Sequence, residues 1–259
     1  MVNSTQKNPA TLTNPDIGRA AGPVSGRMAG PVAGVDGCPA GWLAVRLDPD
    51  SGAARSAIYP DWPALARALA DAARICVDMP IGLVDRGARP CDRAARARLP
   101  RARKSSVFPA PRRYMLGLTY HAVGAAARAR GDAGLSIQAY NIMPKIAELD
   151  TALRPDDQDW VLETHPELAF HRLNAGVELP RKADPAGRAA RRALLEAAGL
   201  GDVDALLAAH PRAQAKPDDV LDAAVCALVA RDSLRDRAHR VPEGAPERDS
   251  RGLRMEIWY

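Results

Sequence analysis

The first part of the chain consists of short apolar or alternating runs separated by turn residues. Three such runs lie at 32–37, 42–48 and 56–59, with Gly, Pro and Asp between them. This pattern predicts three consecutive antiparallel strands joined by tight turns. Apolar residues then recur at helical spacing over 61–73, and a nearly continuous apolar run at 74–83 predicts a buried central strand.

The order of these elements indicates the fold class. Three strands, a helix and a fourth strand are the opening order of a ribonuclease H-like fold. Helical patterns dominate residues 84–158, where helices are predicted at 92–99, 112–130 and 136–153. We therefore predict an α/β protein whose RNase H-like mixed five-stranded sheet is flanked by helices and carries a large helical insertion at about 84–158.

The remaining elements complete this domain. They are predicted as a strand at 160–164, one or two helices over 185–209, a helix at 217–231 and a terminal strand or interface segment at 252–259. Residues 1–30 contain Pro, Gly and polar residues without periodicity, which predicts a flexible N-terminal tail. Residues 31–259 are then expected to form a single domain.

Composition predicts a cytoplasmic protein without a membrane partner. No apolar run approaches the ~20 residues of a membrane span, and the first thirty residues lack the hydrophobic stretch of a secretory signal. The four cysteines are scattered, without a C-x-x-C pair or a histidine at zinc-ligand spacing. Reduced thiols are the expected state, and a structural zinc is not expected.

Positive charge is concentrated in one segment. The chain carries a net charge of +5, yet residues 86–113 hold nine arginines and Lys104 against Asp92, a local charge of +9 that leaves −4 for the remainder. A basic patch suggests a polyanionic partner such as nucleic acid or a nucleotide. The alternative is a solvated basic face in a chain that has 31 Arg and 5 Lys.

Three aspartates lie in segments whose surrounding residues are not expected to stabilise a charge. Asp36 ends the first predicted strand between glycines, Asp78 follows an apolar run, and Asp222 is the one charged residue between 220 and 230. A lone buried carboxylate is costly unless a cation or hydrogen-bond donors meet it. Asp219 precedes Asp222 by about one helical turn and shares its face.

These four carboxylates are expected to converge, because the last helix should pack beside the neighbouring ends of the first and fourth strands. Converging carboxylates repel one another unless divalent cations are bound, so Mg²⁺ or Mn²⁺ is the expected cofactor, held by Asp36, Asp78 and Asp222. Two ions ~4 Å apart would activate water and stabilise the leaving oxygen in phosphodiester cleavage. Taken singly, each aspartate also fits an ordinary turn or helix cap.

Further candidates surround this set. Glu163 ends the predicted strand at 160–164 and suits either another catalytic carboxylate or a salt bridge to the arginine-rich segment. The loop between Pro100 and Pro109 combines cations and hydroxyls that can hold a phosphate, although it also fits a surface loop. The predicted substrate-binding residues are Arg101, Arg103, Lys104, Ser105, Ser106 and Lys145.

Segments covering nearly everything after Gly30, in order, resemble the family catalogued as domain of unknown function 429. They include VAGVDGCPAGW (32–42), ICVDMPIGL (75–83), VLETHPELAF (161–170) and DDVLDAAVCAL (218–228). The resemblance implies an RNase H-like fold and a grouping, itself predicted for the family, with Holliday-junction resolvase-type nucleases. In that pattern Asp36 matches the first-strand aspartate, and Asp219 with Asp222 matches the paired Asp-x-x-Asp of the last helix.

The sequence departs from the nuclease pattern at three points. The fourth-strand carboxylate is normally a glutamate, whereas this chain has the shorter Asp78. Glu163 has no counterpart in the pattern, and the helical insertion is absent from the small resolvases.

The first hypothesis for function is a metal-dependent nuclease that hydrolyses phosphodiester bonds of nucleic acid. Its predicted catalytic residues are Asp36, Asp78, Glu163, Asp219 and Asp222. An actin-like phosphotransferase or ATPase shares the core fold, but no second phosphate-binding hairpin is evident. A third hypothesis is a non-catalytic binder of nucleic acid or nucleotide. The sequence leaves the substrate and the oligomeric state open.

Overall fold

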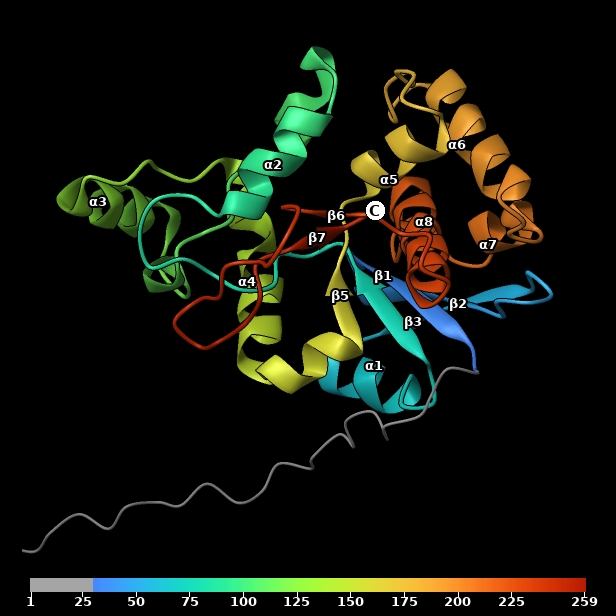
Figure 1. Cartoon of the computed structure of the whole chain (residues 1–259), viewed down its shortest axis with the longest axis horizontal. Coiled ribbons are helices and arrows are strands. Elements are labelled where there is room, and N and C mark those ends of the chain that lie inside the picture. Colours follow the sequence, from blue (N-terminus) through green and yellow to red (C-terminus); the bar gives the residue numbers. More distant parts are fainter. Residues whose placement is uncertain (1–29) are drawn as a thin grey trace, which may run out of the picture.

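The computed structural model describes residues 30–259 and is built around one five-stranded sheet (Figure 1). The predicted tail lies, apart from Gly30, outside the described residues. The sheet order is β3-β2-β1-β4-β5, in which β1 pairs antiparallel with β2 and parallel with β4. The strands are β1 (Val32–Cys38), β2 (Gly41–Leu47), β3 (Ala54–Tyr59), β4 (Arg74–Val77) and β5 (Val161–Glu163).

This topology agrees with the predicted RNase H-like fold. An antiparallel meander of three strands is extended on the β1 side by two parallel strands, β4 and β5. The strands β4 and β5 are neighbours in the sheet although a long helical insertion separates them in the chain. The carboxyl ends of β1, β4 and β5 therefore meet at one edge of the sheet.

Helices cover both faces of the sheet. The longest, α8, packs against β1, β2 and β4, while α1 and α4 contribute to the apolar cluster on the opposite face. The helices are α1 (Trp62–Ala68), α2 (Pro90–Arg98), α3 (Tyr120–Arg130), α4 (Ile137–Ala152), α5 (Pro166–Leu173), α6 (Pro185–Ala197), α7 (Val203–Ala208) and α8 (Pro217–Leu234).

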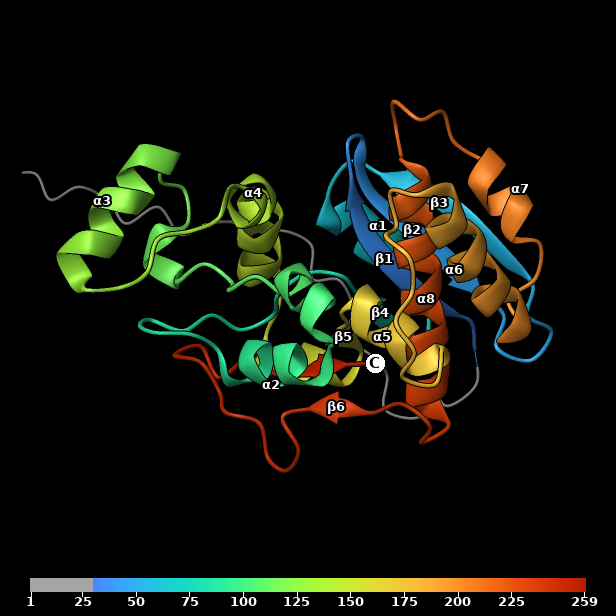
Figure 2. The ribbon, with the colours of Figure 1, turned by 90° about the horizontal axis from the view of Figure 1, so that it is seen from above.

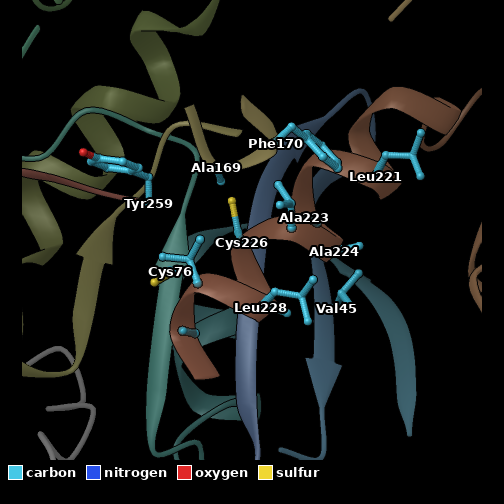
Figure 3. Packing of buried hydrophobic residues seen from close by; sticks show 14 of the residues in the cluster. Val45, Cys76, Ala169, Phe170, Leu221, Ala223, Ala224, Cys226, Leu228 and Tyr259 are labelled. Carbon is cyan, nitrogen blue, oxygen red and sulfur yellow. The ribbon is translucent and has the colours of Figure 1, made fainter. Parts of the chain in front are cut away.

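The backbone of α8 lies almost directly on β1. A Cβ atom built on Gly34 would stand only 2.0 Å from the carbonyl oxygen of Ala223, so no larger residue fits there. Small residues on the helix, including Ala223 and Cys226, face the strands in this layer (Figure 3). The close approach brings the amino-terminal half of α8 to the strand ends, and this fixes where the polar residues of α8 lie.

The helical insertion has a small core of its own. Besides α2, α3 and α4 it contains the short 3-10 helices Arg101–Ser106, Arg113–Met115 and Pro155–Asp159. Met115, Val123, Ala127, Leu135, Ala139 and Met143 form a cluster separate from the two cores of the sheet. Seen from above, α3 projects to one side of the molecule, away from the sheet and α8 (Figure 2).

Several predicted boundaries were wrong. The predicted helix at 112–130 is a 3-10 turn followed by α3, because Gly117 adopts φ +76° and Thr119 caps a new helix. The predicted strand at 74–83 ends at Val77, before Pro80, since proline cannot donate to a strand ladder. The expectation of one or two helices over 185–209 is confirmed as two, α6 and α7, which are separated near Gly199 with φ +84°.

The last segment forms only a short strand. β7 (Ile257–Trp258) pairs antiparallel with β6 (Arg240–Val241), and Trp258 forms a bridge to Thr164 just beyond β5. The predicted terminal strand at 252–259 is thus confirmed over two residues. Among residues 30–259, no helix has both the length and the apolar character needed to cross a bilayer.

Candidate metal centre

Three aspartates from different parts of the chain meet at the edge of the sheet. Asp36 lies on β1, Asp78 follows β4 directly, and Asp222 lies in the second turn of α8. One carboxylate oxygen from each falls within 4.8 Å of the others. The sequence predicted this convergence, and the structure confirms it for these three residues.

Strand register explains the first half of the cluster. Val35 pairs with Val77 in the parallel ladder, and the amide of Asp78 donates to the carbonyl of Val35 at 2.9 Å. The next position along each strand is an aspartate. Val32, Gly34 and Asp36 alternate onto the sheet face that α8 covers, so the carboxylate of Asp36 points toward the helix that carries Asp222.

Burial and mutual repulsion act together on these carboxylates. Asp36 is 9% exposed and Asp222 is 5% exposed. Loss of hydration raises the pKa of Asp36 and of Asp78 well above the ordinary aspartate value, and the charge of the neighbouring carboxylates raises both further. Burial also raises the pKa of Asp222, but the charge of Lys182 opposes that rise. The cluster is thus short of positive charge.

The donor set fits a hard divalent cation. Mg²⁺ prefers oxygen ligands, and carboxylates are among the groups that bind it. Three carboxylate oxygens that lie within 4.8 Å of one another offer such a set of ligands around a common point. Asp36, Asp78 and Asp222 are therefore the residues that would hold Mg²⁺ or Mn²⁺.

Asp219 lies beside the cluster, but its carboxylate caps the start of α8. Its Oδ2 accepts a hydrogen bond from the amide of Lys216 at 2.8 Å, which caps the start of α8. Its charge is still close enough to raise the pKa of Asp36. Of the four converging carboxylates that the sequence predicted, Asp219 has a structural partner of its own, as expected of an acid in the first turn of a helix.

Glu163 belongs to a salt bridge within the protein. Strand alternation gives Glu163 the same orientation as Val161, which packs on the face opposite to α8. Its two oxygens accept hydrogen bonds from Arg89 at 2.6 and 2.7 Å, and the amide of Ile81 donates to it at 2.7 Å. The predicted role of Glu163 as a metal-site carboxylate is not supported by this geometry, whereas the alternative salt bridge is observed.

The pair of Arg89 and Glu163 is deeply buried. Arg89 is 2% exposed and also donates to Asp92 at 2.6 Å and to the carbonyl of Ile81 at 3.0 Å. Desolvation raises the pKa of Glu163 to about 7, although the charge of Arg89 opposes the rise. This network anchors the chain just after Asp78, and it therefore helps to fix the position of that aspartate.

Much of the basic segment 86–113 is used inside the protein. Arg112 is 3% exposed and donates to the carbonyl of Ala133, while Arg113 forms ion pairs with Asp150 and Asp249. Arg103 donates to the carbonyl of Leu179 and lies 3.5 Å from Glu167. These arginines form tertiary contacts. The positive charge that segment 86–113 exposes to solvent is therefore smaller than its sequence charge of +9.

A cavity of about 230 Å³ opens over the aspartates. Its wall combines the acidic cluster with Lys145 and Lys182 and with apolar side chains from the insertion, among them Phe108. Of the predicted substrate-binding residues, Ser106 and Lys145 line this cavity. Arg103 does not line it, and Arg101, Lys104 and Ser105 lie exposed outside its wall.

Lys145 is held close to the first turn of the sheet. Its Nζ donates to the carbonyl of Gly41 at 2.6 Å and stands 4.7 Å from the centroid of the Trp42 ring. A Cβ on Gly37 would approach the Cδ of Lys145 to 2.6 Å, so the lysine side chain passes directly over this end of the strand. The predicted anion contact at Lys145 is thus placed on the cavity wall.

Among the cavity-lining residues that sequence inspection did not single out are Lys182 and His165. Lys182, between α5 and α6, donates to Asp222 Oδ2 at 2.9 Å. His165 follows β5, and burial lowers the pKa of its imidazole. A signal for Lys182 existed: in a chain with 31 Arg and 5 Lys, Lys145, Lys182 and Lys216 all lie at or beside the candidate site.

Comparison with known proteins identifies one family. A family model described as "Protein of unknown function (DUF429)" matches residues 34–247, which include all three aspartates of the cluster. No curated protein and no solved structure matches the chain significantly.

Proposed function

The chain belongs to the DUF429 family of proteins of unknown function, and from its site we propose that it is a metal-dependent hydrolase of phosphodiester bonds, acting as a nuclease. One observation carries the proposal: the carboxylates of Asp36 on β1, Asp78 just after β4 and Asp222 on α8 lie within 4.8 Å of one another in a largely buried cluster. Such a cluster is unfavourable by itself and is stabilised by a divalent cation.

The proposed substrate is a phosphate diester, and the proposed cofactor is Mg²⁺ or Mn²⁺. A divalent cation held here supplies Lewis-acid activation of the attacking water and of the phosphate. Water adds at phosphorus, the bond to one ester oxygen breaks, and that oxygen takes a proton. The products are a phosphate monoester and a hydroxyl end.

The residues of the chain have separate roles in this proposal. Asp36, Asp78 and Asp222 hold the cation, while Lys145 faces the cavity as a positive charge for an incoming phosphate. Phe108 offers an apolar wall beside these charges, suited to a nucleotide base. Glu163 and Arg89 act by holding the segment after Asp78.

The proposed partner is nucleic acid, and the proposed location is the cytoplasm. Exposed Arg101 and Lys104 lie on the 3-10 helix that ends at Ser106, and both Ser106 and Phe108 line the cavity. Cations placed there would meet the backbone of a strand that enters the cavity. All four cysteines of the chain are free and buried, which suits a reducing compartment.

The proposal is tested by metal-dependent turnover. The full chain is incubated with single-stranded and junction DNA, with RNA, and with bis(p-nitrophenyl) phosphate as a small diester, in Mg²⁺, in Mn²⁺ or in EDTA. We expect cleavage with either metal and none in EDTA. Asp78→Asn and Asp222→Asn are expected to lose more than about 100-fold, since even indirect partners of metal ligands cost 10–100-fold.

Controls separate the competing functions. Asp204→Asn removes an exposed carboxylate of α7 that does not line the cavity, and it should keep full activity. Release of phosphate from ATP without diester cleavage would favour the actin-like alternative. Metal-independent binding of nucleic acid with no turnover on any substrate would favour a non-catalytic binder and contradict the proposal.

A further inference from the structure

A lysine from a loop lies over the acidic cluster. Lys182 comes from the segment between α5 and α6, and its Nζ stands 2.9 Å from Asp222 Oδ2. The lysine side chain is 51% exposed, whereas that of Asp222 is 8% exposed. The ammonium group therefore reaches the carboxylates from the cavity side, where a phosphate would also approach.

The charges around the cluster leave room for one divalent cation beside Lys182. Asp36, Asp78 and Asp222 bring three negative charges when all are ionised. One divalent ion and the ammonium of Lys182 bring the net charge of the site to zero. Two divalent ions and the ammonium would leave a net charge of +2. The charge of Asp219 also acts on Asp36, but its Oδ2 already accepts a hydrogen bond from the amide of Lys216.

The position of Lys182 suits a functional role better than a purely structural one. The lysine side chain is half-exposed, so burial in a packed core does not explain its position. The acid that it contacts, in contrast, is one of the three proposed cation ligands. Its charge also acts on Asp36 and Asp78 and not on Asp222 alone.

We propose that the site binds a single divalent cation and that Lys182 supplies the second positive charge. This inference rests on the proposed function, and it narrows the two-ion arrangement expected from the sequence. In the proposed reaction the ammonium of Lys182 would supply positive charge to the phosphate, where negative charge develops, as a second ion would in a two-ion site.

Counting bound Mn²⁺ tests the inference without measuring activity. Free Mn²⁺ is titrated by electron paramagnetic resonance against the full chain and against Lys182→Met, which keeps the length of the side chain and removes its charge. Lys182→Arg keeps the charge. Arg181→Met removes a charge from the neighbouring exposed position, which does not line the cavity.

We expect one Mn²⁺ per chain for the natural protein, for Lys182→Arg and for Arg181→Met, and two for Lys182→Met. We also expect the first ion to bind Lys182→Met roughly tenfold more tightly, because a like charge a few ångströms away is gone. Two ions in the natural protein, or one in all four proteins, would overturn the role of Lys182 while leaving the metal site intact. Failure of every protein to bind Mn²⁺ would overturn the proposed function as well.

Discussion

Gly34 and Ala223 are in backbone contact, and this contact sets the distance between β1 and α8. A Cβ on Gly34 would lie 2.0 Å from the carbonyl oxygen of Ala223. Asp36 is two positions further along the same face of the strand, and Asp222 immediately precedes Ala223 in the helix. The close approach therefore brings two of the three proposed cation ligands together.

Gly34→Ala is expected to damage stability and cation binding together. The added methyl group meets backbone, which cannot rotate away, so the free energy of unfolding should fall by about 1–3 kcal/mol or more. Displacement of α8 should also weaken Mn²⁺ binding in the folded protein. Thermal denaturation and a Mn²⁺ titration measure the two effects.

A second glycine provides the control. Gly124 lies in α3, and a Cβ there would make only an ordinary contact at 3.5 Å with Arg128. Gly124→Ala should stabilise the protein by about 0.5–1 kcal/mol, because alanine favours a helix. A Gly34→Ala protein as stable as the natural one would show that the helix can move without cost.

Without divalent cations, the acidic cluster should make the protein less stable as the pH rises. The folded state holds the pKa of Asp36 and Asp78 well above the ordinary aspartate value, so the folded chain binds more protons than the unfolded chain. Their contribution to stability is thus present below about pH 4 and is lost as the pH rises through the folded-state pKa values. The free energy of unfolding, measured in EDTA at a series of pH values from about 4 upward, tests this expectation.

Two variations separate this contribution from other titrations. Adding Mn²⁺ at neutral pH should restore stability, since the ion binds the ionised cluster of the folded state. In EDTA at neutral pH, Asp78→Asn should raise the melting temperature, because it removes one of the repelling charges. A lower melting temperature for Asp78→Asn in EDTA would mean that repulsion within the cluster is not significant.

Arg89→Met is expected to be strongly destabilising. It leaves the carboxylates of Glu163 and Asp92 buried without their cation, which typically costs about 3–5 kcal/mol. The segment after Asp78 would also lose the hydrogen bond that Arg89 donates to Ile81. Chemical denaturation measures the stability, and Mn²⁺ affinity reports the position of Asp78.

The matched control lies on α2, the helix that Arg89 immediately precedes. Arg98 of α2 forms an exposed ion pair with Glu243, and Arg98→Met should change the free energy of unfolding by at most about 1 kcal/mol. If Arg89→Met and Arg98→Met lowered the free energy of unfolding equally, the buried ion pair of Arg89 and Glu163 would contribute no more to stability than an exposed one.

The double variant Arg101→Ala with Lys104→Ala tests nucleic-acid binding by the exposed part of the basic segment. Both residues are exposed, whereas Arg103 between them supports the fold through Leu179 and Glu167. If both meet phosphates, the slope of log affinity against log salt for single-stranded DNA should decrease by about 1.4, or about 0.7 per contact. Fluorescence anisotropy across a salt series gives this slope.

Arg67 supplies the comparison for that experiment. It is exposed on α1, a helix that packs on the sheet face opposite to α8, and Arg67→Ala should leave the slope unchanged. An unchanged slope in the double variant would favour a small nucleotide substrate over a nucleic-acid strand.

The sequence by itself determined the sheet and the three aspartates at its edge. Alternating and continuous apolar runs identified β1 to β4, because side-chain burial in a strand repeats with a short local period. Asp36, Asp78 and Asp222 were found because each interrupts such an apolar pattern, which marks a buried charge without any knowledge of its neighbours.

Only the tertiary structure decided which partners these charges have. Lys182 meets Asp222 across 40 positions of sequence, and Arg89 meets Glu163 across 74. A local pattern shows that a residue is charged, but an ion pair depends on two chain segments that the fold brings together. For the same reason the arginines of 86–113 looked like one basic surface, although burial assigns several of them to contacts inside the protein.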